Sequence, residues 1–374
     1  LLMETPISLG YFYTGITKQI GFKTGEEGKT MGLASYGKPI YINALREFIG
    51  VDENGDLYCA FKIDKEGKDE EDASLAKWEG LFTTLIPKRT GKIEYITKEI
   101  LTYADFAASG QKLLEEILTK IIKKYSTQTG IKNVCISGGV GLNCPSSSAI
   151  EQMPEIDLVF VQPAANDGGI SLGAAIKGAI DNGDEVGVEM IPYLGPEFTN
   201  EKIEKVLKSK KYLYKKYNNI ERIIAQLIND DNIVANFQGR LEFGPRALGN
   251  RSLLANPKSY EMLVKMNNLK GREVWRPLAP AVMYDKQADY FESNIFSPFM
   301  TKNFNVVKDK VKDLMAITHV DNTARIQSVN RLYNKRFYNI INEFYKLSGI
   351  PVVINTSFNV KGEPIVCTPE EAVN

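Results

Sequence analysis

Three arginines and three glycines crowd residues 236–252, directly after a predicted strand. The arginines are Arg240, Arg246 and Arg251. The planar guanidinium of arginine binds a phosphate or a carboxylate through two parallel hydrogen bonds. Glycines leave the backbone close to a bound group, and Glu242 suggests that one arginine is held in place. This segment predicts an anion-binding site rather than a solvated run of surface charge.

More cations flank the next predicted apolar strand. Lys270, Arg272 and Arg276 stand before it, and Arg325 lies in a later polar segment. That segment also holds His319, the only histidine of the chain. A lone histidine is more often structural than catalytic, so Arg325 is the better candidate there for a phosphate ligand.

Small polar residues follow the last predicted strand of the chain. Asn355, Ser357 and Asn359 lie in this run. Such side chains either bind the phosphate or ribose of a ligand or simply form a turn, and their spacing leaves both readings open.

Two glycine-rich turns in the first half of the chain each follow a predicted strand. Gly138 and Gly139 open the first, with Asn143 nearby. Such a turn before a helix either presents backbone N–H groups to a phosphate or is only a tight connection. The second turn carries Asp167, which suits a hard metal ion or a helix N-cap. Its similarity to the first turn favours a site.

Several common catalytic devices are absent from the sequence. One histidine cannot supply a Ser/His/Asp triad or an H-E-x-x-H metal site, and no G-x-x-x-x-G-K-[ST] loop is present. A nucleotide would therefore be held by backbone glycines and clustered arginines.

The predicted elements alternate between helices and strands. An amphipathic helix at 103–125 precedes strands at 133–137 and 158–161 and a helix at 170–180, which indicates an α/β layered domain. Residues 181–196 have the composition of a linker. A second α/β or α+β unit follows; its predicted helices are 200–208, 220–228, 258–269 and 329–347, and its predicted strands are 232–237, 279–283 and 351–354.

Composition narrows the classes of partner. The 374 residues hold 46 Lys+Arg and 46 Asp+Glu, so net charge gives no general attraction to nucleic acid or to an anionic membrane. Four cysteines without a CxxC pair, and no apolar run long enough to span a bilayer, predict a cytoplasmic protein. Because the sequence opens with Leu1 and stops within a predicted helix start after Thr368, we expect further residues at both ends.

Seven motifs occur in one order along nearly the whole chain. They are GKTMGLASYGKP, CISGGVGLNC, QPAANDGGISLGAA, FQGRLEFGPRALGNRS, REVWRPLAPAVM, HVDNTARIQSV and INTSFNVKGEPIV. Their order resembles the O-carbamoyltransferases of the nodulation-protein U, cephalosporin and tobramycin carbamoylation type. FGPRALGNRS and NTSFNVKGEPIV are the most specific of these motifs.

The resemblance implies an α/β fold with two domains. Residues 1–188 would be the second half of an actin-like domain similar to the tRNA-threonylcarbamoyl transferase. Residues 189–374 would be similar to the threonylcarbamoyl-adenylate synthase (YrdC-like) and would form carbamoyl-adenylate from carbamoyl phosphate and ATP. The first domain would then pass the carbamoyl group to a hydroxyl of a small-molecule or glycan acceptor, with a divalent metal, iron, at its site and Mg²⁺ accompanying ATP.

The resemblance also implies roles for residues that match the motifs. Lys270 with Arg272, and Ser357 with Asn359, resemble the Lys-x-Arg and Ser-x-Asn elements of the adenylate synthases. Asp167 would be a metal ligand. The expected catalytic residues are Arg246, Arg276 and Arg325, and the expected ATP or carbamoyl phosphate ligands are Gly138, Gly139, Asn143, Arg240, Arg251, Lys270, Arg272, Asn355, Ser357 and Asn359.

Two other readings of the sequence stay open. One is an enzyme of tRNA threonylcarbamoylation, which shares both domain types, although the neutral charge argues weakly against a nucleic-acid partner. The other is a truncated module that binds ATP and carbamoyl phosphate without turnover. No membrane partner is expected, and a homodimer is compatible with the sequence.

Overall fold

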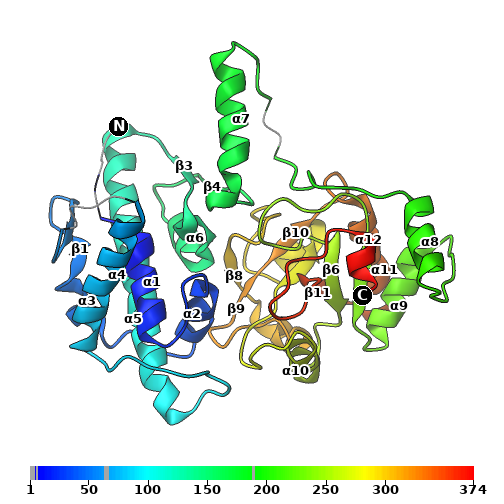
Figure 1. Cartoon of the computed structure of the whole chain (residues 1–374), viewed down its shortest axis with the longest axis horizontal. Coiled ribbons are helices and arrows are strands. Elements are labelled where there is room, and N and C mark those ends of the chain that lie inside the picture. The colour runs from blue at the N-terminus through cyan, green and yellow to red at the C-terminus, as the bar shows by residue number, and fades with distance from the viewer. Residues whose placement is uncertain (1–4, 6, 63–66, 188–189) are drawn as a thin grey trace. The chain divides into compact units, whose positions relative to one another are not determined.

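The chain divides into two compact units, Leu1–Val161 and Gln162–Asn374 (Figure 1). The computed structural model describes residues 5, 7–62, 67–187 and 190–374. The predicted domain boundary between residues 188 and 189 lies outside the described residues. No helix in the described ranges is both long and apolar enough to cross a bilayer.

The first unit is built mainly from helices. A long central helix, α5, is surrounded by shorter ones, and two small sheets pair β1 with β2 antiparallel and β3 with β4 parallel. The elements are α1 (Leu9–Gln19), α2 (Glu27–Ala34), α3 (Ile42–Arg46), β1 (Ile49–Val51), β2 (Leu57–Cys59), α4 (Gly67–Thr83), α5 (Lys98–Thr129), β3 (Asn133–Ile136), η1 (Gly139–Leu142), α6 (Cys144–Glu151) and β4 (Leu158–Val161).

Helix α5 confirms the strongest helix prediction and extends it at both ends. Thr97 caps its start by accepting a hydrogen bond from the backbone N of Ile100. Gly130 ends it with a left-handed φ of 72°, a conformation that glycine adopts without strain. Phe106 of this helix packs edge-on against Phe82, with ring centroids 5.4 Å apart. These contacts form the centre of the apolar core of the first unit.

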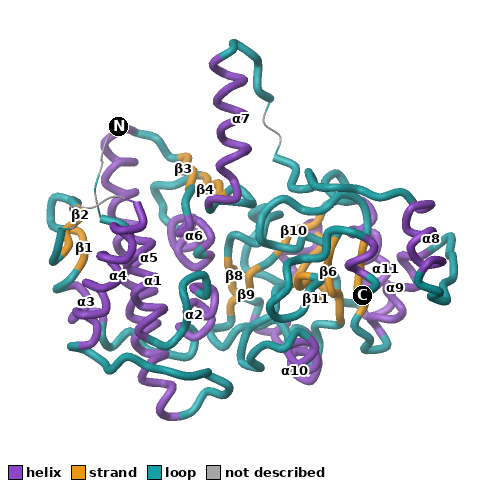
Figure 2. Tube along the Cα trace, in the orientation of Figure 1, coloured by secondary structure: helices purple, strands orange, loops and turns teal. Residues whose placement is uncertain are grey.

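The second unit is organised around one five-stranded mixed sheet (Figure 2). Its strand order is β10-β7-β11-β6-β5; β10 is parallel to β7, and the other pairs are antiparallel. The elements are η2 (Asp167–Gly169), α7 (Ile170–Asp181), α8 (Asn200–Ser209), α9 (Ile220–Asn229), β5 (Val234–Phe237), β6 (Arg251–Ala255), α10 (Tyr260–Leu269), β7 (Pro280–Met283), η3 (Tyr284–Asp289), β8 (Asn303–Asn305), η4 (Lys308–Asp313), β9 (Thr323–Arg325), β10 (Gln327–Val329), α11 (Lys335–Ser348), β11 (Val352–Ser357) and α12 (Pro369–Ala372).

Helix α11 supplies much of the apolar core of this sheet. Phe337, Ile340, Ile341 and Phe344 lie on one side of the helix and are fully buried. The spacing of three and four residues places them on one helical stripe. The mixed α/β class predicted from the sequence is therefore confirmed, while the likeness of the two units to an actin-like domain and an adenylate synthase stays a prediction.

The second half of the predicted linker is bonded to the segment that follows β5. The backbone N of Phe243 donates to the carbonyl of Pro192 at 2.6 Å. Gly195 donates to Leu241 at 2.9 Å, and Leu241 donates in return to Pro196 at 3.0 Å. Residues 192–196 thus run beside residues 241–243 as a short, strand-like ladder and do not form a free tether.

The contact between Gly249 and Phe337 gives a test of this packing. Gly249 has φ of 111°, and a Cβ there would lie 2.3 Å from Phe337 Cδ1. We expect Gly249→Ala to lower the free energy of unfolding by about 2–5 kcal/mol, because strain and overpacking act together. Urea denaturation followed by circular dichroism measures this change.

Gly349→Ala is the matched control. Gly349 also has a positive φ, 74°, but a Cβ there would meet no heavy atom within 4 Å. Gly349→Ala should therefore lower the free energy of unfolding by only about 1–2 kcal/mol, the cost of a left-handed conformation for an L-residue. Equal losses in the two variants would contradict the packing of Gly249 against Phe337.

Candidate anion-binding site

One end of the five-stranded sheet collects the loops that carry most of the predicted cations. The carboxyl ends of β5 and β11 lie there beside the amino ends of β6, β7 and β10, because of the strand directions in the sheet. Arg246 follows β5, Lys270 to Arg276 precede β7, Arg325 precedes β10, and Ser357 ends β11. Sheet topology therefore brings four separate segments of sequence to one place.

Electrostatic interactions among these side chains show that the cations are neighbours. The positive charges of Arg276, Arg325 and Arg246 all act on Arg272. Those of Arg272 and Arg276 also act on Lys270. The structure thus brings together all three arginines that the sequence analysis expects to be catalytic and two of the expected cationic ligands, Lys270 and Arg272. We refer to Arg246, Lys270, Arg272, Arg276 and Arg325 as the cation cluster.

Lys270 is held by the polar residues that follow β11. Its Nζ donates to Ser357 Oγ at 3.2 Å and to Asn359 Oδ1 at 2.8 Å, and it also contacts the carbonyls of both residues at 2.5 and 2.9 Å. The amine is almost fully buried. Burial lowers the pKa of Lys270 to about 7, and repulsion from Arg272 and Arg276 adds to the effect. The two predicted sequence pairs are therefore in direct contact.

Arg272 and Arg325 have hydrogen-bonding capacity that the described part of the chain does not fill. The Nε of each is buried and has no acceptor among the described residues. Arg272 uses its Nη2 to donate to the carbonyl of Pro277 at 2.9 Å. Burial lowers the pKa of Arg272 to about 9, with the neighbouring guanidinium groups adding repulsion, so the group is still charged at pH 7. Buried cationic donors without acceptors are typical of a site that receives an anion.

His319 lies beside this cluster but is held within its own loop. Its Nδ1 lies 3.2 Å from Thr323 Oγ1, which donates to Asp321 Oδ1 at 2.7 Å. Burial, together with the nearby charge of Arg325, lowers the pKa of His319 to about 4, so the imidazole is neutral at pH 7. Arg325 as the anion ligand of that segment stays a prediction.

Three of the other expected ligands hold the backbone around the site. Arg251 is fully buried and donates to the carbonyls of Gln238, Gly239, Asn250 and Pro196. Asn355 is also buried and donates to Gln327 Oε1 at 2.7 Å, and Arg240 donates to the carbonyl of Leu194 at 3.1 Å. These contacts are made to protein atoms, and a role for the three in binding ligand stays a prediction.

Gln327 and Glu242 make buried hydrogen bonds in this region that the sequence does not predict. Gln327 lies on a buried strand and joins Asn355 to the carbonyl of Leu248. A polar residue inside a buried strand needs a hydrogen-bond partner, so its position in the sequence could have indicated a buried polar contact. The sequence predicts Glu242 as a holding group for an arginine, and its three backbone contacts depend on the tertiary structure.

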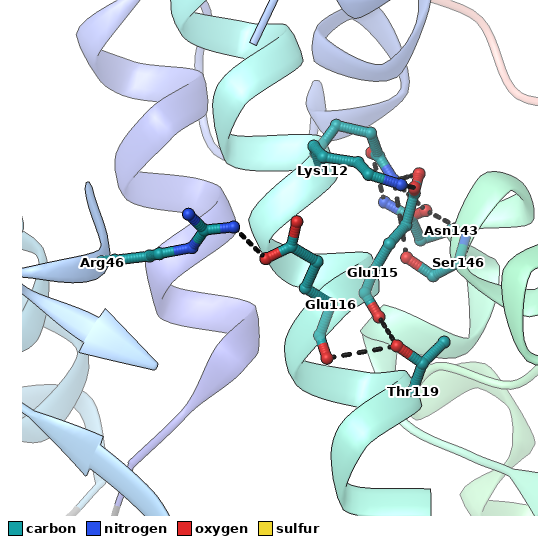
Figure 3. Close-up of polar contacts among 8 residues, drawn as sticks. Arg46, Lys112, Glu115, Glu116, Thr119, Asn143 and Ser146 are labelled. Atoms are coloured by element: carbon teal, nitrogen blue, oxygen red, sulfur yellow. Dashed lines mark hydrogen bonds and ion pairs between the residues drawn. The ribbon is translucent and has the colours of Figure 1, made fainter. Parts of the chain in front are cut away.

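The first unit places the other predicted nucleotide ligands around the turn after β3. Gly138 and Gly139 are exposed there, and Gly138 has φ of 90°. Asn143 caps α6 by accepting from the backbone N of Ser146 at 3.1 Å, and its side chain exchanges two hydrogen bonds with Gln111, each 3.0 Å long (Figure 3). Asn143 therefore has a local structural role, and nucleotide binding at this turn stays a prediction.

Asp167 lies exposed in the turn that precedes α7. Within the described ranges, no three His, Cys, Asp or Glu side chains gather as a metal-binding group. One carboxylate is fewer ligands than a divalent metal takes from a protein site. The described residues do not by themselves fit the expected metal, and Asp167 as its ligand stays a prediction.

Two family models match the chain. The model for the carbamoyltransferase N-terminus matches residues 1–176, and the model for the carbamoyltransferase C-terminus matches residues 225–374. The second match contains the whole cation cluster.

Three curated relatives each align with 98% of the chain. The chain is 34% identical to nodulation protein NolO of Bradyrhizobium diazoefficiens and 34% identical to nodulation protein NolNO of Sinorhizobium fredii, and it covers 65% and 53% of their lengths. It is 35% identical to the uncharacterized protein sll1178 of Synechocystis sp. and covers 64% of its length. The chain thus spans roughly half to two thirds of these relatives.

The buried amine of Lys270 predicts a pH dependence of stability. Above a folded-state pKa of about 7 and below the unfolded value of 10.5, the unfolded chain binds one proton that the folded chain lacks. Stability from this group therefore rises with pH in that window, by at most about 1.4 kcal/mol per pH unit. Below pH 7 both states carry the proton and the slope from this group disappears.

Lys270→Met removes the titrating group and should remove this slope. Urea unfolding of the wild type and the variant at pH values from 6.5 to 9 measures the difference in their free energies of unfolding. We expect the free energy of unfolding of the wild type to rise relative to that of the variant as the pH increases above 7. A difference that is constant over the whole range would contradict the lowered pKa.

Proposed function

The chain belongs to the carbamoyltransferase family, and from that premise we propose that it takes part in an ATP-dependent transfer of a carbamoyl group to a hydroxyl. In this proposal, the second unit makes carbamoyl-adenylate and the first unit passes the carbamoyl group to the acceptor. The observation that carries the proposal is the cation cluster, with buried guanidinium donors that lack acceptors in the described chain.

The substrates suit a site of this charge. ATP and carbamoyl phosphate are both polyanions, and the cluster supplies four guanidinium groups and one amine at the same end of the sheet. Overall, carbamoyl phosphate, ATP and water give carbamoyl-adenylate, pyrophosphate and phosphate. The carbamate released from carbamoyl phosphate attacks the α-phosphorus of ATP, and the bond to the departing pyrophosphate breaks.

The cations would act mainly by positioning and by electrostatic stabilisation. Negative charge develops on the pyrophosphate as it leaves, and fixed guanidinium groups stabilise it without reorganising. Arg272 and Arg325 have the unfilled donors for this role, and Arg246 and Arg276 lie within electrostatic reach of Arg272. Lys270 would shape the site through Ser357 and Asn359, which it already contacts.

A small molecule or a glycan with a free hydroxyl is the proposed acceptor class. Relatives at 34% identity are named as nodulation proteins, which does not by itself fix the acceptor of this chain. Adenylation gives the carbamoyl group a good leaving group, so an acceptor hydroxyl can displace AMP and form a carbamate ester.

Release of pyrophosphate from ATP tests the proposal directly. The signal should depend on added carbamoyl phosphate. Arg246→Ala should lower its rate by about a hundredfold or more, because a cation that stabilises developing charge is lost. Circular dichroism checks that the variant is folded.

Arg222→Ala is the control for the loss of one positive charge. Arg222 is exposed on α9, outside the cation cluster, and its replacement should leave the rate unchanged. Full activity of Arg246→Ala would contradict the assignment of Arg246. Stimulation by threonine and bicarbonate in place of carbamoyl phosphate would support tRNA threonylcarbamoylation instead.

A further inference from the structure

Glu242 is a buried carboxylate that the proposed reaction does not use. It lies at the start of the loop that carries Arg246, and it is 6% exposed. Its Oε1 accepts hydrogen bonds from three backbone N–H groups, those of Leu248 at 2.8 Å, Asn250 at 2.6 Å and Arg251 at 3.2 Å. One oxygen atom therefore ties the start of the loop to its end and closes residues 242–251 into a ring.

The carbonyl groups of the same loop are held from outside the ring. Leu248 O accepts from Tyr193 Oη at 2.9 Å and from Gln327 Nε2 at 2.8 Å. Gly249 O accepts from Asn236 Nδ2 at 2.6 Å. The backbone after Arg246 is thus fixed on its N–H side by Glu242 and on its carbonyl side by neighbouring elements.

This loop places one cation of the cluster. Arg246 lies inside the ring, two residues before Leu248, and its charge acts on Arg272. Like charges repel, so a mobile Arg246 would move away from the other guanidinium groups and toward solvent. A loop that is already ordered avoids the entropy loss of fixing Arg246 when an anion binds.

We propose that Glu242 is a positioning residue that holds Arg246 in the anion site through the backbone of residues 242–251. The proposal rests on the proposed function, because it assumes that the cation cluster binds a polyphosphate. Its distinguishing feature is that Glu242 acts through Arg246. The two residues must therefore show coupling that a general loss of stability does not produce.

A double-mutant cycle on the 374-residue chain measures this coupling. Isothermal titration calorimetry would give the affinity for ATP and for inorganic pyrophosphate in the wild type, Glu242→Ala, Arg246→Ala and the double variant. We expect Glu242→Ala and Arg246→Ala each to weaken binding about tenfold or more. The double variant should bind no more weakly than Arg246→Ala alone.

Two further variants separate positioning from stability. Glu242→Gln keeps a carbonyl oxygen for the three N–H groups and should restore affinity to within about fivefold of the wild type. Gln287→Ala is the matched control: Gln287 is fully buried, donates to the carbonyls of Ser293 and Ile295 and accepts from Ser328 Oγ, and none of these partners belongs to residues 242–251. It should lower stability and leave the affinity for pyrophosphate unchanged.

Should Glu242→Ala fail to fold, Glu242→Asp carries the cycle. Its carboxylate is one methylene shorter and cannot reach the same three N–H groups, so it should weaken binding only where Arg246 is present. If the double variant loses affinity by the product of the two single-variant factors, the positioning role is overturned and the proposed function is not affected. A wild type that binds neither ATP nor pyrophosphate would overturn both.

Discussion

Mutual repulsion among clustered cations, one of them buried and four half-buried, is the constraint on which the anion site of the second unit depends. Four guanidinium groups and one amine meet at one end of a sheet, where burial strengthens every interaction between charges. Such a group persists only if each member is tied to the protein by hydrogen bonds. Lys270 has Ser357 and Asn359, and Arg272 has Pro277. A polyanion would relieve the repulsion that these ties hold in place.

The same constraint explains the dense polar network behind the cluster. Arg251, Asn355, Gln327 and Glu242 are all buried, and all donate to or accept from the backbone or from one another. Breaking one of these buried contacts would leave a further polar group without a partner, beside Glu242 Oε2, Arg251 Nε and Asn355 Oδ1, which have none among the described residues. The residues that touch a ligand are therefore expected to be fewer than the polar residues that the motifs contain.

The sequence predicted the elements that depend on local patterns. The helix at 103–125 and the strand at 279–283 appear in the structure as α5 and β7, because apolar periodicity and clear end signals define them. The strand β6 was missed, since Arg251 and Ser252 begin it with polar side chains that only the tertiary structure satisfies. The helix predicted from 329 begins at Lys335 in the structure, because β10 takes up residues 327–329.

Prediction of the site followed the same division. Arginine clusters and the Lys-x-Arg and Ser-x-Asn pairs could be read from residue types, and the structure brings them together. Residue types alone did not show which polar residues face the anion site and which hold the backbone. Arg246 and Arg251 lie five residues apart in one motif, yet the charge of Arg246 acts on Arg272, whereas Arg251 is buried against backbone carbonyls. That difference arises because Arg246 lies in the loop between β5 and β6 and Arg251 begins β6, a boundary that the sequence pattern did not reveal.

The ladder between residues 192–196 and 241–243 fixes the backbone on both sides of the entry to the Arg246 loop. Its backbone bonds lie directly before the ring that Glu242 closes, and Tyr193 from the same stretch reaches the carbonyl of Leu248. A backbone shift at residues 192–196 would therefore displace the groups that hold the backbone around Arg246.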